Sequence, residues 1–129
     1  MGVNFLIDTN TLIYYFKNEI PEAKAKELDS AFLIECNISI MTKIELLSFH
    51  GSSKEDEAQT VSFITDCTLF HLTDEIVAKT IALRKQYRLK IPDAIIAATA
   101  MVNNMTLVSR NDKDFQQIKH LKYINPFRL

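Results

Sequence analysis

Four acidic residues stand where helices are expected to begin, and their type suits metal-assisted hydrolysis. They are Asp8, Glu45, Asp93 and Asp112. Each alone has an ordinary explanation, because an acid in the first turn of a helix caps it or complements its dipole. Glu45 also completes a Thr-x-x-Glu capping box with Thr42. Asp93 is the least ordinary, because it heads the most apolar helix of the chain, where an unpaired charge is costly.

Together, the four acids point to a cation. Carboxylates forced into one place repel each other unless some bind protons or a cation neutralises them. Ligands that are all oxygens favour Mg²⁺ or Mn²⁺, which activate a water and stabilise charge on a phosphoryl group. Helix starts beside them would turn amide donors toward phosphate oxygens. The sequence therefore predicts phosphodiester hydrolysis by a metal-activated water, and it contains no nucleophile elbow, P-loop or dinucleotide motif.

The hydrophobic pattern supplies elements that would bring these acids together. Strands are expected over 3–7, 36–41, 67–72, 105–109 and 121–124. Helices are expected over 9–17, 21–35, 42–49, 53–66, 73–87, 93–103 and 112–118, with a break at Gly51-Ser52-Ser53. Strands that alternate with helices predict an α/β fold with a parallel sheet, whose ligands bind at the carboxyl ends of the strands.

Length and composition predict one globular domain over residues 1–129. Apolar residues make up 47% and charged residues 24%, an ordinary balance for a folded chain. Neither a membrane span nor a signal peptide is evident, so a cytoplasmic protein without membrane contact is expected. The net charge of −1 hides a modest basic excess that remains once a cation neutralises the acids.

The cysteines and histidines give no sign of a zinc site. Cys36 and Cys67 have no CxxC partner, and His50, His71 and His120 lack metal-ligand spacing. The cysteines are expected to be reduced, buried side chains, with a disulfide only in an oxidising compartment.

Several motifs, taken in order, resemble those of a known family. The chain is similar to the PIN-domain ribonucleases, and most closely to the VapC-type toxins of toxin–antitoxin pairs, over essentially its whole length. The matching segments are Ile7-Asp8-Thr9-Asn10, Thr42-x-x-Glu45, Pro92-Asp93-Ala94, Ser109-Arg110-Asn111-Asp112-Lys113-Asp114-Phe115 and Tyr123-Ile124-Asn125-Pro126-Phe127.

This resemblance implies a three-layer sandwich of helices around a short parallel sheet and Mg²⁺- or Mn²⁺-dependent cleavage of RNA. By position it assigns Asp8, Glu45 and Asp93 as catalytic and metal-binding acids. Asp112 is preferred for the fourth place, with Asn111 and Asp114 as alternatives. Thr9 matches a polar residue that, in the family, supports the first acid or a metal-bound water. The resemblance also implies a homodimer and a small antitoxin protein, although some PIN domains serve other RNA processing.

Basic residues near the acids are candidate phosphate contacts. Lys43 and Arg110 flank predicted acids, and Arg88 and Lys90 belong to a basic run before Asp93. The ordinary alternative is that cations at the end of a helix complement its dipole. Tyr87, within the same run, either stacks on a base or belongs to the core.

The first helix carries more aromatic surface than one face can bury. Tyr14, Tyr15 and Phe16 are consecutive, so at least one is expected to be exposed. Such exposure often marks an interface, and a groove for an antitoxin helix is one version of it. The alternative is that two of the three belong to the core.

Two rival functions remain from the sequence. The segment after the first strand is similar to that of aspartyl-phosphate phosphatases, but these need a second acid where Asn10 stands. The other rival is a non-catalytic PIN-like module that binds RNA or a protein. Loss of acids is the usual mark of such a module, and Asp8, Glu45 and Asp93 are all present.

Overall fold

The computed structural model describes residues 4–48 and 53–127. Its strands and helices alternate along the chain as expected. In order, they are β1 (Phe5–Ile7), α1 (Thr9–Phe16), α2 (Glu22–Ile34), β2 (Asn37–Ser39), α3 (Ile40–Leu47), α4 (Lys54–Asp66), β3 (Thr68–Phe70), α5 (Asp74–Gln86), α6 (Ile91–Val102), β4 (Thr106–Val108), α7 (Asp112–Phe115) and β5 (Tyr123–Ile124).

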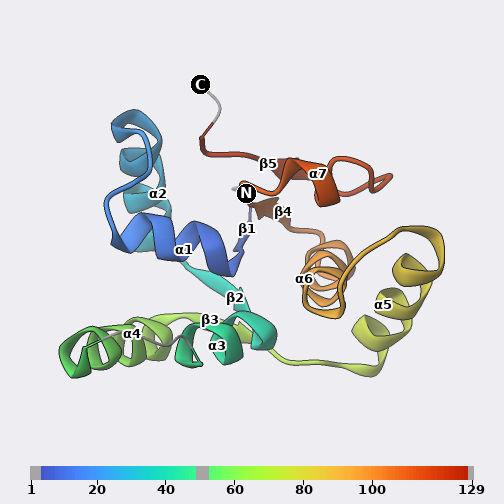
Figure 1. Ribbon diagram of the computed structural model, residues 1–129, viewed down its shortest axis with the longest axis horizontal. Helices are drawn as coiled ribbons and strands as arrows, with labels where there is room; N and C mark the ends of the chain where they lie inside the picture. The colour runs from blue at the N-terminus through green and yellow to red at the C-terminus, as the bar shows by residue number, and fades with distance from the viewer. Residues whose placement is uncertain (1–3, 49–52, 128–129) are drawn as a thin grey trace.

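The five described strands form one parallel sheet in the order β3-β2-β1-β4-β5. Helices cover both faces, so the expected α/β sandwich is confirmed. Figure 1 shows α1, α2 and α4 on one side of the sheet and α5 and α6 on the other. Because β1 and β4 lie at the centre, the residues that follow them meet at the same edge.

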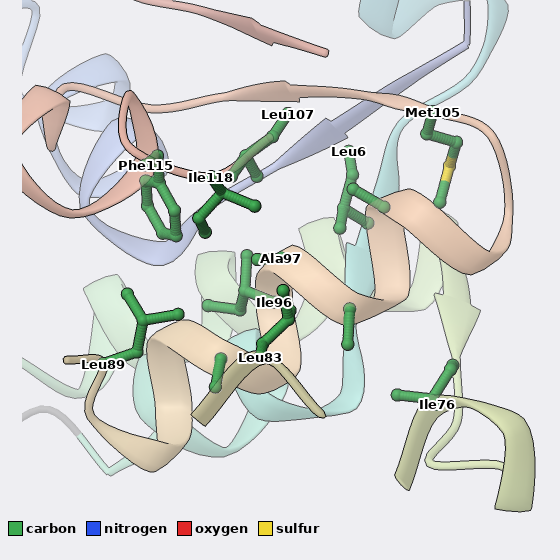
Figure 2. Packing of buried hydrophobic residues seen from close by; sticks show 13 residues of the cluster. Leu6, Ile76, Leu83, Leu89, Ile96, Ala97, Met105, Leu107, Phe115 and Ile118 are labelled. Carbon is green, nitrogen blue, oxygen red and sulfur yellow. The ribbon is translucent and has the colours of Figure 1, made fainter. Parts of the chain in front are cut away.

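Alternation along the central strands divides the core in two. Leu6 and Leu107 face the cluster that α5, α6 and α7 build, whereas Ile7 and Val108 face the cluster of α1 to α4. Successive side chains of a strand point to opposite faces, so each short strand serves both layers. Figure 2 shows the first cluster gathered between α6 and the strands, with Phe115 and Ile118 closing one end.

Helix α6 is the central helix of the first layer, as its apolar sequence predicts. Ala94, Ala97, Ala98 and Ala100 are each fully buried, and their small side chains let α5 pack closely against α6. This burial fixes the axis of α6. It therefore also fixes where the polar first turn of that helix emerges.

Several helix starts follow the sequence expectation. Ser53 caps α4 by accepting a hydrogen bond from the Asp56 amide, and Thr73 caps α5 in the same way through Ile76. Pro92 stands in the first turn of α6, where its missing amide costs nothing. Helix α6 begins at Ile91, two residues earlier than expected.

The region around Glu45 differs from the expectation. The second strand ends at Ser39, and α3 begins at Ile40 with Ser39 as its cap. The predicted capping box of Thr42 and Glu45 is therefore wrong, because both residues lie inside the helix. The alternating pattern up to Met41 concealed the helix start.

Three expectations fall outside the described residues. These are the strand start at Val3, the helix end at Phe49 and the break at Gly51-Ser52. Across the described part of the chain, no helix is both long and apolar enough to cross a membrane.

Candidate active site

Asp8 lies at the carboxyl end of β1 and caps α1. Its Oδ1 accepts a hydrogen bond from the Thr11 amide at 2.9 Å, and its Oδ2 accepts one from Ser109 Oγ at 2.6 Å. Only 5% of the residue is exposed. Burial raises the pKa of Asp8 against the lowering effect of these hydrogen bonds, and the charge of Glu45 raises it further. Asp8 is thus a rigidly held, buried carboxylate.

Glu45 reaches the same edge from α3. Its Oε1 accepts a 2.7 Å hydrogen bond from Thr9 Oγ1, and that hydroxyl also lies 3.2 Å from Thr42 Oγ1. Thr9 and Thr42 are both buried. The start of α1 therefore orients the Glu45 carboxylate, whereas the expectation from the resemblance linked Thr9 to the first acid or to a metal-bound water.

Asp93 is half-buried in the first turn of α6. The pKa of its carboxyl is raised from 3.8 to about 6, mainly by burial and then by the charges of Asp114, Glu45 and Asp8 in that order. Lys90, at the cap of α6, acts in the opposite direction. The charges of acids from four separate segments therefore act on one another at this edge of the sheet. We call these four residues the acid cluster: Asp8, Glu45, Asp93 and Asp114.

Asp112 and Asp114 have different surroundings, although only one residue separates them. Asp114 accepts a 2.8 Å hydrogen bond from Asn111 Nδ2, and Asn111 Oδ1 accepts one from the Asp114 amide. Asp112 instead accepts hydrogen bonds from the Tyr123 hydroxyl and from Asn125 Nδ2, the latter at 3.2 Å. Side chains two positions apart on a helical turn do not face the same way. Asp114 is thus the acid of this segment whose charge most strongly affects Asp93.

The donor set of the acid cluster fits a hard divalent cation. Its members offer only carboxylate oxygens, and like charges raise the pKa of Asp93. Within residues 4–48 and 53–127, no three Asp, Glu, His or Cys side chains lie close enough together to hold a metal ion between them. Mg²⁺ keeps several of its waters and takes only one or two carboxylates directly, so widely spaced acids suit a hydrated ion.

The basic candidates are distributed unevenly around the cluster. The charge of Lys90 reaches Asp93, while Arg88 is exposed and Lys43 is half-buried on α3. The Arg110 guanidinium lies over two aromatic rings, 5.1 Å from the centroid of Tyr14 and 4.5 Å from that of Phe127. These cation–π contacts orient an exposed arginine two residues after the end of β4.

The aromatic candidates divide between core and surface. Tyr87 packs against the core, and its hydroxyl accepts a hydrogen bond from the Lys119 amide at 3.0 Å. Tyr14 and Tyr15 are half-buried, whereas 41% of Phe16 is exposed. The reading of Tyr14 and Tyr15 as partly core residues therefore agrees with the structure.

Ser109 was not singled out from the sequence as a site residue. It is fully buried, donates to Asp8 and accepts a 3.0 Å hydrogen bond from the Asn111 amide. The sequence feature that could have identified Ser109 is its position, because it directly follows β4 as Asp8 directly follows β1. Only the pairing of these two strands shows that the positions meet.

Comparison with known proteins places the chain in a family. A family model described as the PIN domain matches residues 5–121. The chain belongs to the PIN-domain family.

Its relatives narrow the likeness to the VapC type. The chain is 28% identical to Ribonuclease VapC1 of Methanocaldococcus jannaschii over 120 residues, which cover 88% of this chain and 80% of that protein. It is also similar to a chain of a toxin–antitoxin complex from Klebsiella pneumoniae, with a TM-score of 0.80 and 31% identity over 98% of this chain and 100% of the other.

A third comparison supports the fold alone. A chain of the DNA-bound VapBC complex of Salmonella typhimurium matches with a TM-score of 0.83 and 22% identity, over 97% of this chain and 99% of the other. The resemblance found in the sequence is therefore confirmed by both sequence and structure.

Proposed function

We propose that the protein is a Mg²⁺- or Mn²⁺-dependent endoribonuclease and the toxin of a type II toxin–antitoxin pair. The observation that carries this proposal is the electrostatic coupling of Asp93 to Asp114, Glu45 and Asp8. Membership of the PIN-domain family and likeness to a VapC ribonuclease support the same activity.

In this proposal Asp8, Glu45, Asp93 and Asp114 hold the cation. When bound, the ion supplies a more acidic water as the nucleophile and stabilises negative charge on the phosphoryl group. Asp114 takes the fourth place in preference to Asp112, because its charge is the one that acts most on Asp93. Asp112 then serves to hold the start of α7 against β5 through Tyr123 and Asn125.

The chain's own residues keep this site in order. Ser109 and the Thr11 amide fix the two oxygens of Asp8, and Thr9 fixes one oxygen of Glu45. Asp93, with a pKa of about 6, exchanges a proton near neutral pH when no cation neutralises its neighbours. The hydrogen bonds restrict carboxylate rotation, so less order has to be gained when substrate arrives.

RNA is the proposed substrate, with Lys90 and Arg110 as its main phosphate contacts. Lys90 lies within electrostatic reach of Asp93, and the rings of Tyr14 and Phe127 hold Arg110 beside the segment that carries Asp114. Arg88 and Lys43 are weaker candidates, because no described contact directs either toward the acids. Action on cellular RNA would place the protein in the cytoplasm.

A small antitoxin protein is the proposed partner. A cavity of about 380 Å³ lies between α1 and α4, and its lining includes Ile13, Phe16 and Phe63. Edge-to-face packing of Phe16 on Phe63, with centroids 5.0 Å apart, leaves an apolar surface suited to the apolar face of a helix. The likeness to a toxin–antitoxin complex supports this assignment.

Cleavage of a labelled, structured RNA pool with Mn²⁺ tests the nuclease. Wild type should cut, chelator should stop it, and Asp93→Asn should lose activity by about a hundredfold or more. Asp66→Asn is a matched control, because Asp66 is an exposed acid at the end of α4.

Two results would contradict the proposal. Equal cutting by wild type and Asp93→Asn would remove Asp93 from the site. An intact RNA pool with antitoxin-free wild type would favour the non-catalytic binding module, which a binding assay on the same RNA would then detect.

A further inference from the structure

Cys36 and Cys67 lie side by side, although 31 positions separate them in the sequence. Each directly precedes a strand, and the two strands are paired in parallel with Asn37 opposite Thr68. The Thr68 amide donates a 2.8 Å hydrogen bond to the carbonyl of Cys36, the residue just before Asn37. The pairing of β2 with β3 therefore sets the two cysteines opposite each other.

Both cysteine side chains point to the same face of the sheet. Cys36 lies two residues before Ile38, and Cys67 lies two residues before Leu69, so each cysteine points to the same face as its partner in that pair. All four residues belong to the cluster beneath α1 to α4. The two thiols also interact electrostatically, since each shifts the pKa of the other. Adjacent strands lie about 4.8 Å apart, within the roughly 4.4–6.8 Å of Cα separation that a disulfide spans.

The two thiols differ in access and in acidity. Cys36 is 6% exposed, whereas Cys67 is half-buried and donates from Sγ to the Phe63 carbonyl at 3.3 Å. The interaction between the side chains lowers the pKa of Cys67 and, together with burial, raises that of Cys36. Cys67 is therefore the better nucleophile and the more accessible one.

We propose that Cys36 and Cys67 form a reversible, peroxide-sensitive dithiol, with Cys67 as the thiol oxidised first and Cys36 as the resolving thiol. This differs from the sequence expectation of two reduced, buried side chains that form a disulfide only in an oxidising compartment. It does not depend on the proposed nuclease activity, since neither cysteine belongs to the acid cluster.

The reaction balances with hydrogen peroxide as the oxidant. The Cys67 thiolate attacks one peroxide oxygen, the O–O bond breaks, and hydroxide leaves to take up a proton as water. The sulfur of Cys36 then displaces the hydroxyl of the Cys67 sulfenic acid. The S–S bond forms, the S–O bond breaks, and the Cys36 proton leaves with the hydroxide as a second water.

The disulfide would close a loop that contains α3 and α4. It would join the start of β2, directly after α2, to the start of β3, directly after α4. Closing a loop of this length restricts the unfolded chain, so the oxidised protein should melt about 5–10 °C higher than the reduced protein.

The test treats native, reduced protein with equimolar hydrogen peroxide and measures its intact mass and its free thiols after denaturation. We expect both thiols to disappear, the mass to fall by about 2 Da for two lost hydrogens, and dithiothreitol to reverse both changes. Peptide mapping should find Cys36 joined to Cys67 within one chain. Retention of two thiols, or addition of oxygen to Cys67 with Cys36 still free, would overturn the proposal.

Two single variants assign the roles of the cysteines. Cys36→Ser should stop at the sulfenic acid, which a 1,3-diketone traps on Cys67. Cys67→Ser should leave Cys36 reacting at least about tenfold more slowly, because it is buried and its pKa is raised. Equal trapping rates in the two variants would contradict the order of attack. Circular dichroism checks that both variants fold. The mass measurement uses the wild-type protein, so its result stands even if a variant does not fold.

Discussion

Ser109 Oγ donates a 2.6 Å hydrogen bond to Asp8 Oδ2, and this bond joins positions 101 residues apart in the sequence. Both residues are buried and each directly follows a central strand. The bond therefore ties the first acid of the site to the segment that carries Asp114. Loss of that hydroxyl should disturb both stability and activity.

Ser109→Ala should lower the free energy of unfolding by about 1–3 kcal/mol at pH 7, because it leaves a buried carboxylate oxygen without its donor. The change should also reduce RNA cleavage, since Asp8 would rotate more freely. Urea unfolding measures the first effect. Ser62→Ala, on the exposed face of α4, is the matched control and should change neither quantity. A fully stable Ser109→Ala protein would mean that water replaces the hydroxyl at no cost.

The raised pKa of Asp93 predicts how stability depends on pH. The folded state holds this proton up to about pH 6, whereas the unfolded carboxyl loses it near 3.8. Between these values the folded state binds more protons, so in chelator stability should fall as pH rises through that window. Asp93→Asn should flatten this fall and should be more stable than wild type at pH 7 by about 1–3 kcal/mol. Asp8 has the same sign of shift, so some decline should remain in the variant.

Thermal or urea unfolding at several pH values between 3.5 and 7 would check this prediction at about half-unit steps. Asp66→Asn should follow the wild-type curve. A variant curve parallel to wild type would show that the pKa of Asp93 is not raised in the folded state.

The two acids of the α7 segment should behave differently when each is changed to the amide. Asp114→Asn should reduce cleavage by about a hundredfold or more, because it removes a proposed metal-binding carboxylate. Asp112→Asn should retain most activity and instead lose about 1–2 kcal/mol of stability, because its acceptor role toward Tyr123 is weakened. Tyr123→Phe should reproduce that loss of stability. The reverse pattern would restore Asp112 to the fourth place.

Mn²⁺ should stabilise the folded protein. A cation at about one hundred times its dissociation constant should add about 2.7 kcal/mol, which raises Tm by several degrees. Differential scanning calorimetry with and without Mn²⁺ measures this shift, and chelator should reverse it. Asp93→Asn should lose most of the shift, while Asp66→Asn should keep it. An equal shift in both variants would place the bound ion elsewhere.

The homodimer that the family resemblance implies should use the exposed apolar face of α5. Val77 and Ile81 are one helical turn apart and are 39% and 52% exposed. Ile81→Lys should give monomers in sedimentation velocity, because it places a charge in that face. Val61→Lys changes a residue of similar exposure on α4 and should leave the dimer intact. A dimer that survives Ile81→Lys would have to use another surface.

The α/β fold could be predicted from the sequence because its elements have clear local signals. Pro92, Ser53 and Thr73 mark helix starts through local chemistry, and the apolar run of α6 identifies a buried helix. The local sequence does not determine the end of an element where one pattern fits both a strand and a helix. Residues 36–41 alternate as a strand does, yet the last two belong to α3, because Ser39 caps a helix there.

The sequence by itself determined the order of the helices and strands, and it showed which acids stand at their ends. Both follow from capping and periodicity, which act between residues close together in the chain. The tertiary structure decided which of those acids lie close enough for their charges to act on one another. It brings the charge of Asp114 to bear on Asp93, and it brings Ser109 to Asp8 and Cys36 to Cys67. Each of these relationships crosses between strands or around a turn. They depend on strand order and register, which arise from packing over the whole chain and leave no mark on the neighbouring residues in sequence.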